Sequence, residues 1–426
     1  MNGRSDSTRA SGTNGQTMSS KSFPSMPEVG VIGLGVDLWG DYWQVRHHVL
    51  TRLAQYFHVV WCNPARSWRK LFHHSPPWNP ENDYGRAIPP SFTVYTPAKW
   101  LPAIGHPRLL ADWTLKQYLR QAESLLRKAG CRKLILYIWR PWYQRALDLI
   151  TSDLSCYHID DEYTFSAVEK PIDARERCLI SRVNQVFIHS PALLGKKGGI
   201  NPQTMYMPNG VDSQAYMAPQ SQPIDLEPVP HPRIGYVGFI KHDLDLPLLL
   251  ALAERHRQWS FVFIGPIRNL GKHAALIHQL SLLPNVHFLG GKSMQALPAY
   301  VQHLDVCMLC YEVSDYTKFI YPLKLHEYLA SGRPVVSAPI RSVQEFAHVI
   351  RIASTLEDWS QALADLLVPA SGALEQAEVR RQIARQHDWD LLVRLIAKSL
   401  CSRLGPTYEK RFESIPQRFE PTAKDF

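Results

Sequence analysis

The sequence contains no apolar run close to the roughly 18 residues that a membrane-spanning helix needs. Its first 27 residues are rich in Ser, Gly, Asn and Thr and lack the apolar core of a signal peptide. We therefore expect a disordered leader over residues 1–27. The predicted location is cytoplasmic, with a peripheral position at the inner face of the membrane left open.

Cysteine is scarce, with seven residues scattered through 426. One pair, Cys307 and Cys310, has C-x-x-C spacing within the segment VCMLCY. That segment is typical of a buried strand, in which the two side chains point to opposite faces. No second pair follows, so the pattern argues against a zinc site and favours reduced, apolar cysteines.

Acidic residues are fewer than basic ones, 38 against 47, and the formal net charge is +9. This excess suggests anionic partners such as sugar nucleotides or an acidic membrane surface. No zinc-finger spacing, RNP signature or long Lys/Arg run is present, so we do not expect a nucleic acid partner.

A chain of this length favours two domains. Apolar strands such as Val29–Val36 and Lys133–Trp139 alternate with helical segments, which predicts a doubly wound α/β domain over residues 28–217. Residues 218–232 contain five prolines and are interpreted as a linker. The α/β pattern restarts over 233–386, an amphipathic helix is expected over 387–403, and the charged tail 404–426 is expected to be loose.

A dinucleotide fingerprint begins at Gly33-Leu34-Gly35, but Leu38 stands where the third glycine would be. The second strand also ends at Asn63 rather than at an acidic ribose ligand. We therefore reject an NAD site. The two glycines are interpreted as allowing a loop to approach a ligand or the partner domain closely.

The most informative stretch is YPLKLHEYLASGRPVVSAP, Tyr321 to Pro339. Pro322 suits the first residue of a helix over 322–331. Lys324 places a cation in the first turn, where free N–H groups already favour an anion, so this helix start suits a phosphate. Glu327, one turn later, could accept hydrogen bonds from both ribose hydroxyls. The alternative is that Lys324 and Glu327 form a surface ion pair.

This stretch resembles the P-x-K-x-x-E-Y-x-A-x-G-x-P-V-V segment of the group 1 glycosyltransferases, a family with the two-domain GT-B fold. The matching residues are Pro322, Lys324, Glu327, Tyr328, Ala330, Gly332, Pro334, Val335 and Val336. The resemblance implies that the segment holds the nucleotide part of a sugar-nucleotide donor. Many members carry E-x7-E with the first glutamate near the sugar; Glu327 matches the second, but Phe319 stands at the first.

Other segments resemble family landmarks in the same order along the chain, so the resemblance spans about residues 29–402. They are DDEY (160–163), PNGVD (208–212), RIGYVGFI (233–240) and FVFIGP (261–266). The resemblance implies a GT-B architecture with two Rossmann-like domains facing across a cleft. It also implies that the helix following Trp389 crosses back to the first domain.

The donor should bind beyond the carboxyl ends of the strands in the second domain. The residues predicted to bind it are Gly238, Lys241, Gly265, Thr317, Lys318, Pro322, Lys324 and Glu327. Turn glycines, a solvated lysine and an ordinary loop hydroxyl are the alternatives for the first four. We predict no metal and no cofactor apart from the donor, because Asp245 of the D-x-D at 243–245 is expected to cap a helix.

The acceptor side should come from the first domain, where Asp160, Asp161 and Glu162 follow a strand. One of them could be a general base if the reaction inverts, or could position the acceptor hydroxyl if it retains. The alternative is an acidic cluster at a helix N-terminus. Arg46 and Arg140 could face a phosphate or a sugar carboxylate. For each first-domain tryptophan taken singly, a role in the core is the better prediction.

We therefore predict a hexosyltransferase that moves a sugar from a nucleotide-sugar to a glycan or lipid-linked acceptor. The predicted reaction is retaining and metal-independent, and the predicted role is in polysaccharide or cell-envelope biosynthesis. Two alternatives stay open: a sugar-nucleotide epimerase of the same architecture, and a GT-B-like binding subunit without turnover.

Overall fold

The computed structural model describes residues 24–65, 88–98, 100–101, 103, 106–164, 169–368 and 372–416. Most of the predicted leader lies outside the described residues. Its last part does not: the Met26 side chain is fully buried, and its backbone N–H donates to Tyr56 O at 2.8 Å. The ordered part of the chain therefore begins before residue 28.

The first domain contains a seven-stranded parallel sheet in the order β3-β2-β1-β4-β5-β6-β7. Its five inner strands are apolar and almost entirely buried, as expected for a sheet that is covered on both faces, whereas the edge strands are partly exposed. The strand bounds are β1 (Val29–Leu34), β2 (His58–Cys62), β3 (Phe92–Tyr95), β4 (Lys133–Ile138), β5 (Leu154–Ile159), β6 (Gln185–Ile188) and β7 (Thr204–Tyr206).

Two separate apolar clusters cover the faces of this sheet. One combines the strands with α1, α13 and α14, and the other combines them with α2, α4 and α5. The helices up to the domain boundary are α1 (Val45–Leu53), α2 (Arg108–Lys128), α3 (Ala146–Leu149), α4 (Ala174–Arg182), α5 (Pro191–Lys197) and α6 (Ser213–Met217), with 3-10 turns η3 (Pro141–Arg145) and η4 (Gly198–Ile200).

Gly33 of the broken fingerprint serves helix packing. A Cβ atom there would lie 2.6 Å from Leu50 Cδ1 of α1, so Gly33 lets α1 pack closely against β1. A Cβ atom at Gly35 would make only an ordinary contact of 3.5 Å with Arg46 Cδ. For Gly35 the approach of a ligand or of the partner domain stays a prediction.

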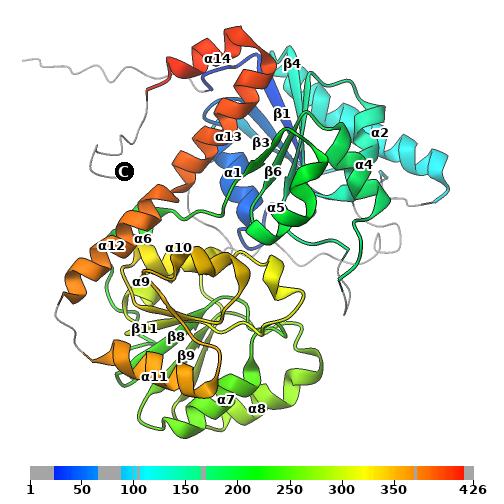
Figure 1. The fold of residues 1–426 in the computed structure, drawn as a ribbon. Coiled ribbons are helices and arrows are strands. Elements are labelled where there is room, and N and C mark those ends of the chain that lie inside the picture. The colour runs from blue at the N-terminus through cyan, green and yellow to red at the C-terminus, as the bar shows by residue number, and fades with distance from the viewer. Residues whose placement is uncertain are drawn as a thin grey trace, which may run out of the picture.

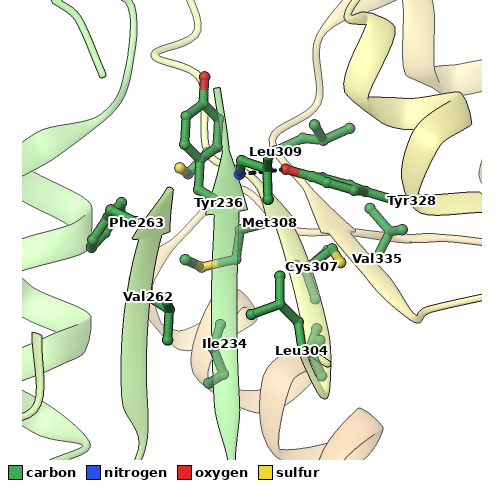
Figure 2. Packing of buried hydrophobic residues seen from close by; sticks show 14 of the residues in the cluster. Ile234, Tyr236, Val262, Phe263, Leu304, Cys307, Met308, Leu309, Tyr328 and Val335 are labelled. Atoms are coloured by element: carbon green, nitrogen blue, oxygen red, sulfur yellow. Dashed lines mark hydrogen bonds between the residues drawn. The ribbon is translucent and has the colours of Figure 1, made fainter. Parts of the chain in front are cut away.

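The second domain contains a six-stranded parallel sheet in the order β10-β9-β8-β11-β12-β13. Figure 2 shows its core, where side chains of β8, β9 and β11 pack together and the Tyr328 hydroxyl accepts a hydrogen bond at 2.9 Å from Val237 N. The strand bounds are β8 (Arg233–Val237), β9 (Ser260–Ile264), β10 (Val286–Gly290), β11 (Val306–Leu309), β12 (Val335–Ser337) and β13 (Arg351–Ile352).

The segment predicted as a linker packs onto this domain, because Leu226 and Val229 are buried in the same apolar cluster. The helices of the second domain are α7 (Leu246–Arg255), α8 (Ala274–Ser281), α9 (Leu297–Gln302), α10 (Leu323–Ala330), α11 (Leu356–Leu367) and α12 (Ala373–Gln386), with 3-10 turns η5 (Gly271–His273), η6 (Thr317–Phe319) and η7 (Arg341–Phe346). Asp245 caps α7 as predicted, accepting from Leu248 N at 3.0 Å.

The chain crosses back to the first domain at residues 387–390, between α12 and α13 (Trp389–Leu404). Val211 exchanges backbone hydrogen bonds with His387 and Trp389, and Arg52 of α1 pairs with Asp390 at 2.6 Å. In Figure 1, α13 lies along the first domain beside α1 while α12 stays with α10. The two parallel α/β sheets and the returning helix agree with the predicted fold class.

The expected loose tail is wrong in its first part. Residues 406–413 form α14 (Pro406–Glu413), and the Phe412 side chain is 3% exposed against the first-domain core. The charged residues of this segment occupy its outer side, which explains why composition alone suggested a loose tail. Among the described residues, no helix is both long enough and apolar enough to cross a bilayer.

Candidate functional site

Helix α10 begins where the second domain faces the first. Pro322 has an extended backbone and precedes the first helical residue, Leu323, so it caps the helix instead of starting it. The first turn contains no acidic side chain, and Lys324 is its second residue. Backbone N–H groups and an ammonium therefore concentrate positive charge at this helix start.

Two glycines bring the ends of β8 and β9 against that helix start. A Cβ atom at Gly238 would lie 1.9 Å from Lys324 Cε, and one at Gly265 would lie 2.1 Å from the Gly238 carbonyl oxygen. Their φ angles are +144° and +147°, a region that L-residues rarely adopt. The space left at Gly238 is thus occupied by Lys324 itself, while direct contact of these glycines with a donor stays a prediction.

Lys324 extends across the end of the sheet instead of along the helix surface. Its Nζ atom lies 3.4 Å from the Tyr311 hydroxyl and 5.3 Å from the centre of the Tyr236 ring. Burial lowers the pKa of Lys324, and the carboxylates of Glu327 and Asp243 oppose that shift. A simple surface ion pair does not describe this environment.

Glu327 is oriented from the other side by α6. Burial raises the pKa of Glu327, while Lys324 and a hydrogen bond with Tyr216 lower it. Tyr216 is buried where the chain passes between the domains. An acid and a lysine that are only partly solvated therefore lie together one turn apart on α10.

Lys241 connects this cluster to the first domain. Its Nζ atom lies 2.8 Å from Asp243 Oδ2, and its charge lowers the pKa of both Lys324 and Asp161. Asp161 belongs to the first domain, so the charge of Lys241 acts on both the predicted donor side and the predicted acceptor side. This is the first link between the two halves of the predicted site.

The three adjacent acids of the first domain differ sharply in their surroundings. Asp160 pairs with Arg46, accepts from Arg140 at 2.6 Å and accepts from the Tyr163 hydroxyl at 2.5 Å. The positive charges of Arg140 and Arg46 hold the pKa of Asp160 well below its usual value, despite burial. Its oxygens are committed to these partners, and the two arginines are committed to it.

Glu162 is committed in a similar way. It is buried and pairs with Lys196 at 3.1 Å and Lys197 at 3.4 Å, and its Oε1 atom accepts from the Thr164 backbone at 3.0 Å. Lys197 is also fully buried and pairs with Glu176 at 2.8 Å. Glu162 is therefore part of an ionic cluster beneath the surface.

Asp161 differs from both neighbours, because no ion pair to its carboxylate is present among the described residues. Burial and the neighbouring charge of Asp160 raise its pKa to about 6, against a smaller lowering by Arg140 and Lys241. Its Oδ1 atom accepts one hydrogen bond, from the backbone N–H of Glu162 at 2.8 Å. Of the three predicted catalytic acids, this is the one whose environment suits proton exchange near neutral pH.

The predicted donor contacts at Thr317 and Lys318 have protein partners. Thr317 is buried, its hydroxyl donates to Glu312 O at 2.5 Å, and its backbone N–H donates to Ser314 Oγ. The backbone N–H of Lys318 donates to Ser314 O, and its ammonium pairs with Glu169 of the first domain at 2.5 Å. These groups shape the turn and join the domains.

Phe319 stands where the family resemblance would place the first glutamate of E-x7-E. Its side chain is 3% exposed and lies in an apolar cluster of the first domain with Ile188 and Leu193. Lys196 Nζ lies 5.2 Å from the centre of its ring. The position at which the family resemblance implies an acid here anchors one domain to the other.

Asp243, Tyr311 and Tyr316 join the candidate site in the structure, although the sequence did not mark them as binding residues. Asp243 is 4% exposed, its Oδ1 atom has no hydrogen-bond partner among the described residues, and its charge raises the pKa of both tyrosines. Burial is the main cause of the raised pKa of Tyr316, and the charge of Asp161 in the first domain adds to it. The D-x-D spacing was the available signal for Asp243; nothing in the sequence marks the tyrosines.

The first-domain tryptophans divide into two classes. Trp139 and Trp43 are buried as predicted, whereas Trp142 is 52% exposed and Trp100 is 65% exposed. The core role expected for the latter two is therefore wrong. Within the described ranges no group of three or more His, Cys, Asp or Glu side chains is arranged to hold a metal ion.

The second domain carries a family signature. Residues 231–368 match the family model described as Glycosyl transferases group 1. The chain is 30% identical over 168 residues to the putative teichuronic acid biosynthesis glycosyltransferase TuaH of Bacillus subtilis. That match covers 39% of this chain and 42% of TuaH, so the chain spans less than half the length of this relative.

Solved structures resemble nearly the whole chain. The Anabaena protein HepE, in complex with UDP, has a TM-score of 0.58 at 15% identity and covers 88% of this chain and all of its own. Trehalose-6-phosphate synthase from E. coli, bound with UDP-2-fluoro glucose, has a TM-score of 0.59 at 9% identity and covers 91% of this chain and all of its own.

At these identities the similarity to solved structures establishes the fold. The two parallel sheets and the returning helix agree with it. The chain therefore has the GT-B fold, and residues 231–368 of its second domain match the model of the group 1 glycosyl transferases.

Proposed function

We propose that this protein is a hexosyltransferase that transfers a sugar from a nucleotide-sugar donor to a glycan or lipid-linked acceptor. The proposed pathway class is polysaccharide or cell-envelope glycan synthesis, supported by the name of TuaH. The observation that carries the proposal is the start of α10, where the Lys324 side chain packs over Gly238 with its Nζ atom 3.4 Å from the Tyr311 hydroxyl, close to the buried Asp243 that pairs with Lys241.

Each charged group has a proposed role. Lys324, Lys241 and the free N–H groups of α10 would neutralise the departing diphosphate, which is how cations and helix starts stabilise developing negative charge without a metal. Glu327 would accept hydrogen bonds from the ribose hydroxyls. Asp160, Glu162, Thr317 and Lys318 are left out of the proposed substrate contacts because their polar groups already have protein partners.

We propose a reaction that retains the anomeric configuration. The bond from the anomeric carbon to the phosphate oxygen breaks, and a bond to the acceptor oxygen forms on the same face. The acceptor proton passes to the departing phosphate oxygen, and Asp161 positions the acceptor hydroxyl. In an inverting reaction Asp161 would take that proton instead, and NMR of the product linkage separates the two outcomes.

Donor binding tests the proposal. A thermal-shift screen against UDP-, GDP-, ADP- and dTDP-sugars should find one donor class that raises the melting temperature. Lys324→Met keeps the alkyl stem over Gly238 but removes the charge, so donor affinity should fall about tenfold or more. Glu327→Gln should cause a smaller loss, and Lys398→Met, at an exposed position on α13, serves as the control.

Two results would contradict the donor site. Unchanged donor affinity in both α10 variants would remove the site assignment. Tight donor binding without transfer to any acceptor or to water would instead favour a binding subunit, and conversion of the donor without an acceptor would favour an epimerase.

We also propose a peripheral membrane contact at the start of α2. Leu109 is 86% exposed, Trp113 is 49% exposed and nearby Trp100 is 65% exposed, with Arg108 exposed beside them. Apolar side chains that insert at the headgroup boundary, next to a cation, suit an anionic lipid surface. A lipid-linked acceptor would be reached from such a surface.

Vesicle co-sedimentation tests this contact. The protein should bind phosphatidylglycerol vesicles more strongly than phosphatidylcholine vesicles, and Leu109→Glu with Trp113→Glu should abolish the difference. Leu374→Glu, at an equally exposed position in the second domain, is the matched control. Equal binding by the double variant and the control would refute the proposed surface.

A further inference from the structure

Two neighbouring cavities open on the first domain beyond the carboxyl ends of its strands. One has a volume of about 820 Å³ and the other about 580 Å³. Both are lined by Pro141, Trp142 and Arg175, so these residues stand between them. We call the two cavities together the Trp142 trough.

The trough lies where this sheet should bind a ligand. Val36 follows β1, Pro64 follows β2, and Pro141 and Trp142 follow β4. At its other end Tyr163 and Thr164 line the wall, and the Tyr163 hydroxyl donates to Asp160 at 2.5 Å. Open α/β sheets bind ligands at this edge, and here the edge reaches the segment that carries the three predicted acids.

Trp142 provides a flat apolar surface inside the trough. It is 52% exposed, and its ring meets the ring of Tyr163 edge-on with 6.4 Å between the centres. The preceding Pro141 is buried, which fixes the start of η3 and leaves the indole projecting from the turn. A half-exposed indole between two cavities suits stacking on the apolar face of a sugar ring.

Positive charge on the trough walls is available, while the acids there are already engaged. Arg108 and Arg175 are exposed. Asp112 accepts from Arg145 at 3.1 and 2.7 Å, Glu176 pairs with Lys197 at 2.8 Å, and Asp173 accepts from the backbone N–H of Arg175 at 2.9 Å. The trough therefore offers guanidinium groups to a phosphate or a carboxylate.

We propose that the Trp142 trough binds the acceptor, and that the acceptor sugar carries an anionic group. The sugar ring stacks on Trp142, and Arg175 with Arg108 contacts the phosphate or carboxylate. The identification of this ligand as the acceptor rests on the proposed function. Recognition of an anionic sugar by Trp142 and Arg175 does not depend on the proposed function, and it can be measured without any donor.

Isothermal titration with three probes tests the site. The probes are glucose 6-phosphate, glucuronic acid and glucose. The two anionic probes should bind at least tenfold more tightly than glucose. Which of the two binds more tightly shows whether the site prefers a phosphate or a carboxylate. Trp142→Ala should weaken all binding tenfold or more, and Trp142→Phe should restore part of it. Arg175→Met should reduce the preference for anionic over neutral probes to about threefold or less.

Controls separate this inference from a folding defect and from the proposed function. Arg120→Met, at an exposed position on α2 outside the trough, should bind like the unmodified protein. Nucleotide-sugar binding and the melting temperature should be unchanged in the trough variants. If no nucleotide-sugar binds but glucuronic acid still requires Trp142, the proposed function fails while the trough stands.

The opposite results overturn the inference. Equal affinity for glucose and both anionic probes would remove the anionic specificity. Unchanged binding in Trp142→Ala, or absence of binding by all three probes to the unmodified protein, would remove the site.

Discussion

The two halves of the proposed site are built in different ways. On the second domain, backbone geometry dominates: Gly265 packs on Gly238, and Gly238 packs on Lys324 at distances that exclude a side chain. On the first domain, ion pairs dominate: Asp160 is held by Arg46 and Arg140 from other elements. The second-domain half depends on the absence of side chains at Gly238 and Gly265, and the first-domain half depends on the ion pairs of Asp160.

This difference teaches how each half carries its functional group. In the second domain the close glycine contacts position a lysine whose charge has little solvent around it. In the first domain burial and, after it, the charge of Asp160 raise the pKa of the neighbouring Asp161. Substitutions that damage packing should therefore lower the free energy of unfolding by a different amount than substitutions that leave a charge unpaired.

The largest expected effect is from Asp160→Asn. It removes the carboxylate that pairs with both buried arginines and leaves Arg46 with Asp37, so the free energy of unfolding should fall by about 3 kcal/mol. Urea denaturation measures this loss. Asp148→Asn, which breaks ion pairs of a side chain that is 31% exposed, should cost less than about 1 kcal/mol. An equal loss of unfolding free energy in the two variants would contradict the greater contribution expected from the buried ion pairs.

Gly265→Ala should be next, with a loss of about 2 kcal/mol in the same measurement. The added Cβ atom would meet the Gly238 carbonyl at 2.1 Å, and backbone cannot move aside as a side chain can. Gly291→Ala is the control, because its Cβ atom would find ordinary contacts of 3.5 Å or more. A stable Gly265→Ala protein with normal donor binding would show that the close packing is dispensable.

The pH dependence of stability should reveal Asp161. Its pKa of about 6 in the folded state lies above that of an unfolded aspartate, so the folded protein binds more protons between about pH 4 and 6. The contribution of this group is therefore present at low pH and lost as the pH rises through 6. Asp161→Asn should remove a pH-dependent contribution to the free energy of unfolding over this pH range. That contribution is on the order of 1 kcal/mol, after allowance for partial exposure.

The comparison of the two unfolding curves is the measurement for Asp161. The difference in stability between the unmodified protein and Asp161→Asn should change with pH over this window and be constant above pH 7. A difference that does not vary from pH 4 to 7 would mean that Asp161 titrates normally in the folded state.

The smallest expected effect is from Lys318→Met. Lys318 and Glu169 are 37% and 33% exposed, so their ion pair should contribute less than about 1 kcal/mol and should weaken with salt. Denaturation at 0.05 and 0.5 M NaCl measures this. A loss as large as that of Asp160→Asn would show that the contact between the domains, and not the Asp160 network, holds the first-domain half together.

Local patterns were enough for most of the fold. Continuous apolar strands separated by helices predicted both parallel sheets, and the start of α10 was placed within one residue. The misses share a cause, because α14, Trp142 and the role of Gly33 depend on what packs against them. A charged segment, a lone tryptophan and a glycine look the same in sequence whether or not a partner surface lies nearby.

The sequence by itself determined the helix start with Lys324 and Glu327, because cap, spacing and charge lie within six consecutive residues. Only the tertiary structure decided which of Asp160, Asp161 and Glu162 has no ion pair among the described residues. The reason is electrostatic: the pKa of a carboxyl depends on burial and on charges brought from elsewhere, here from Arg46 and Arg140, which lie 114 and 20 residues away along the chain.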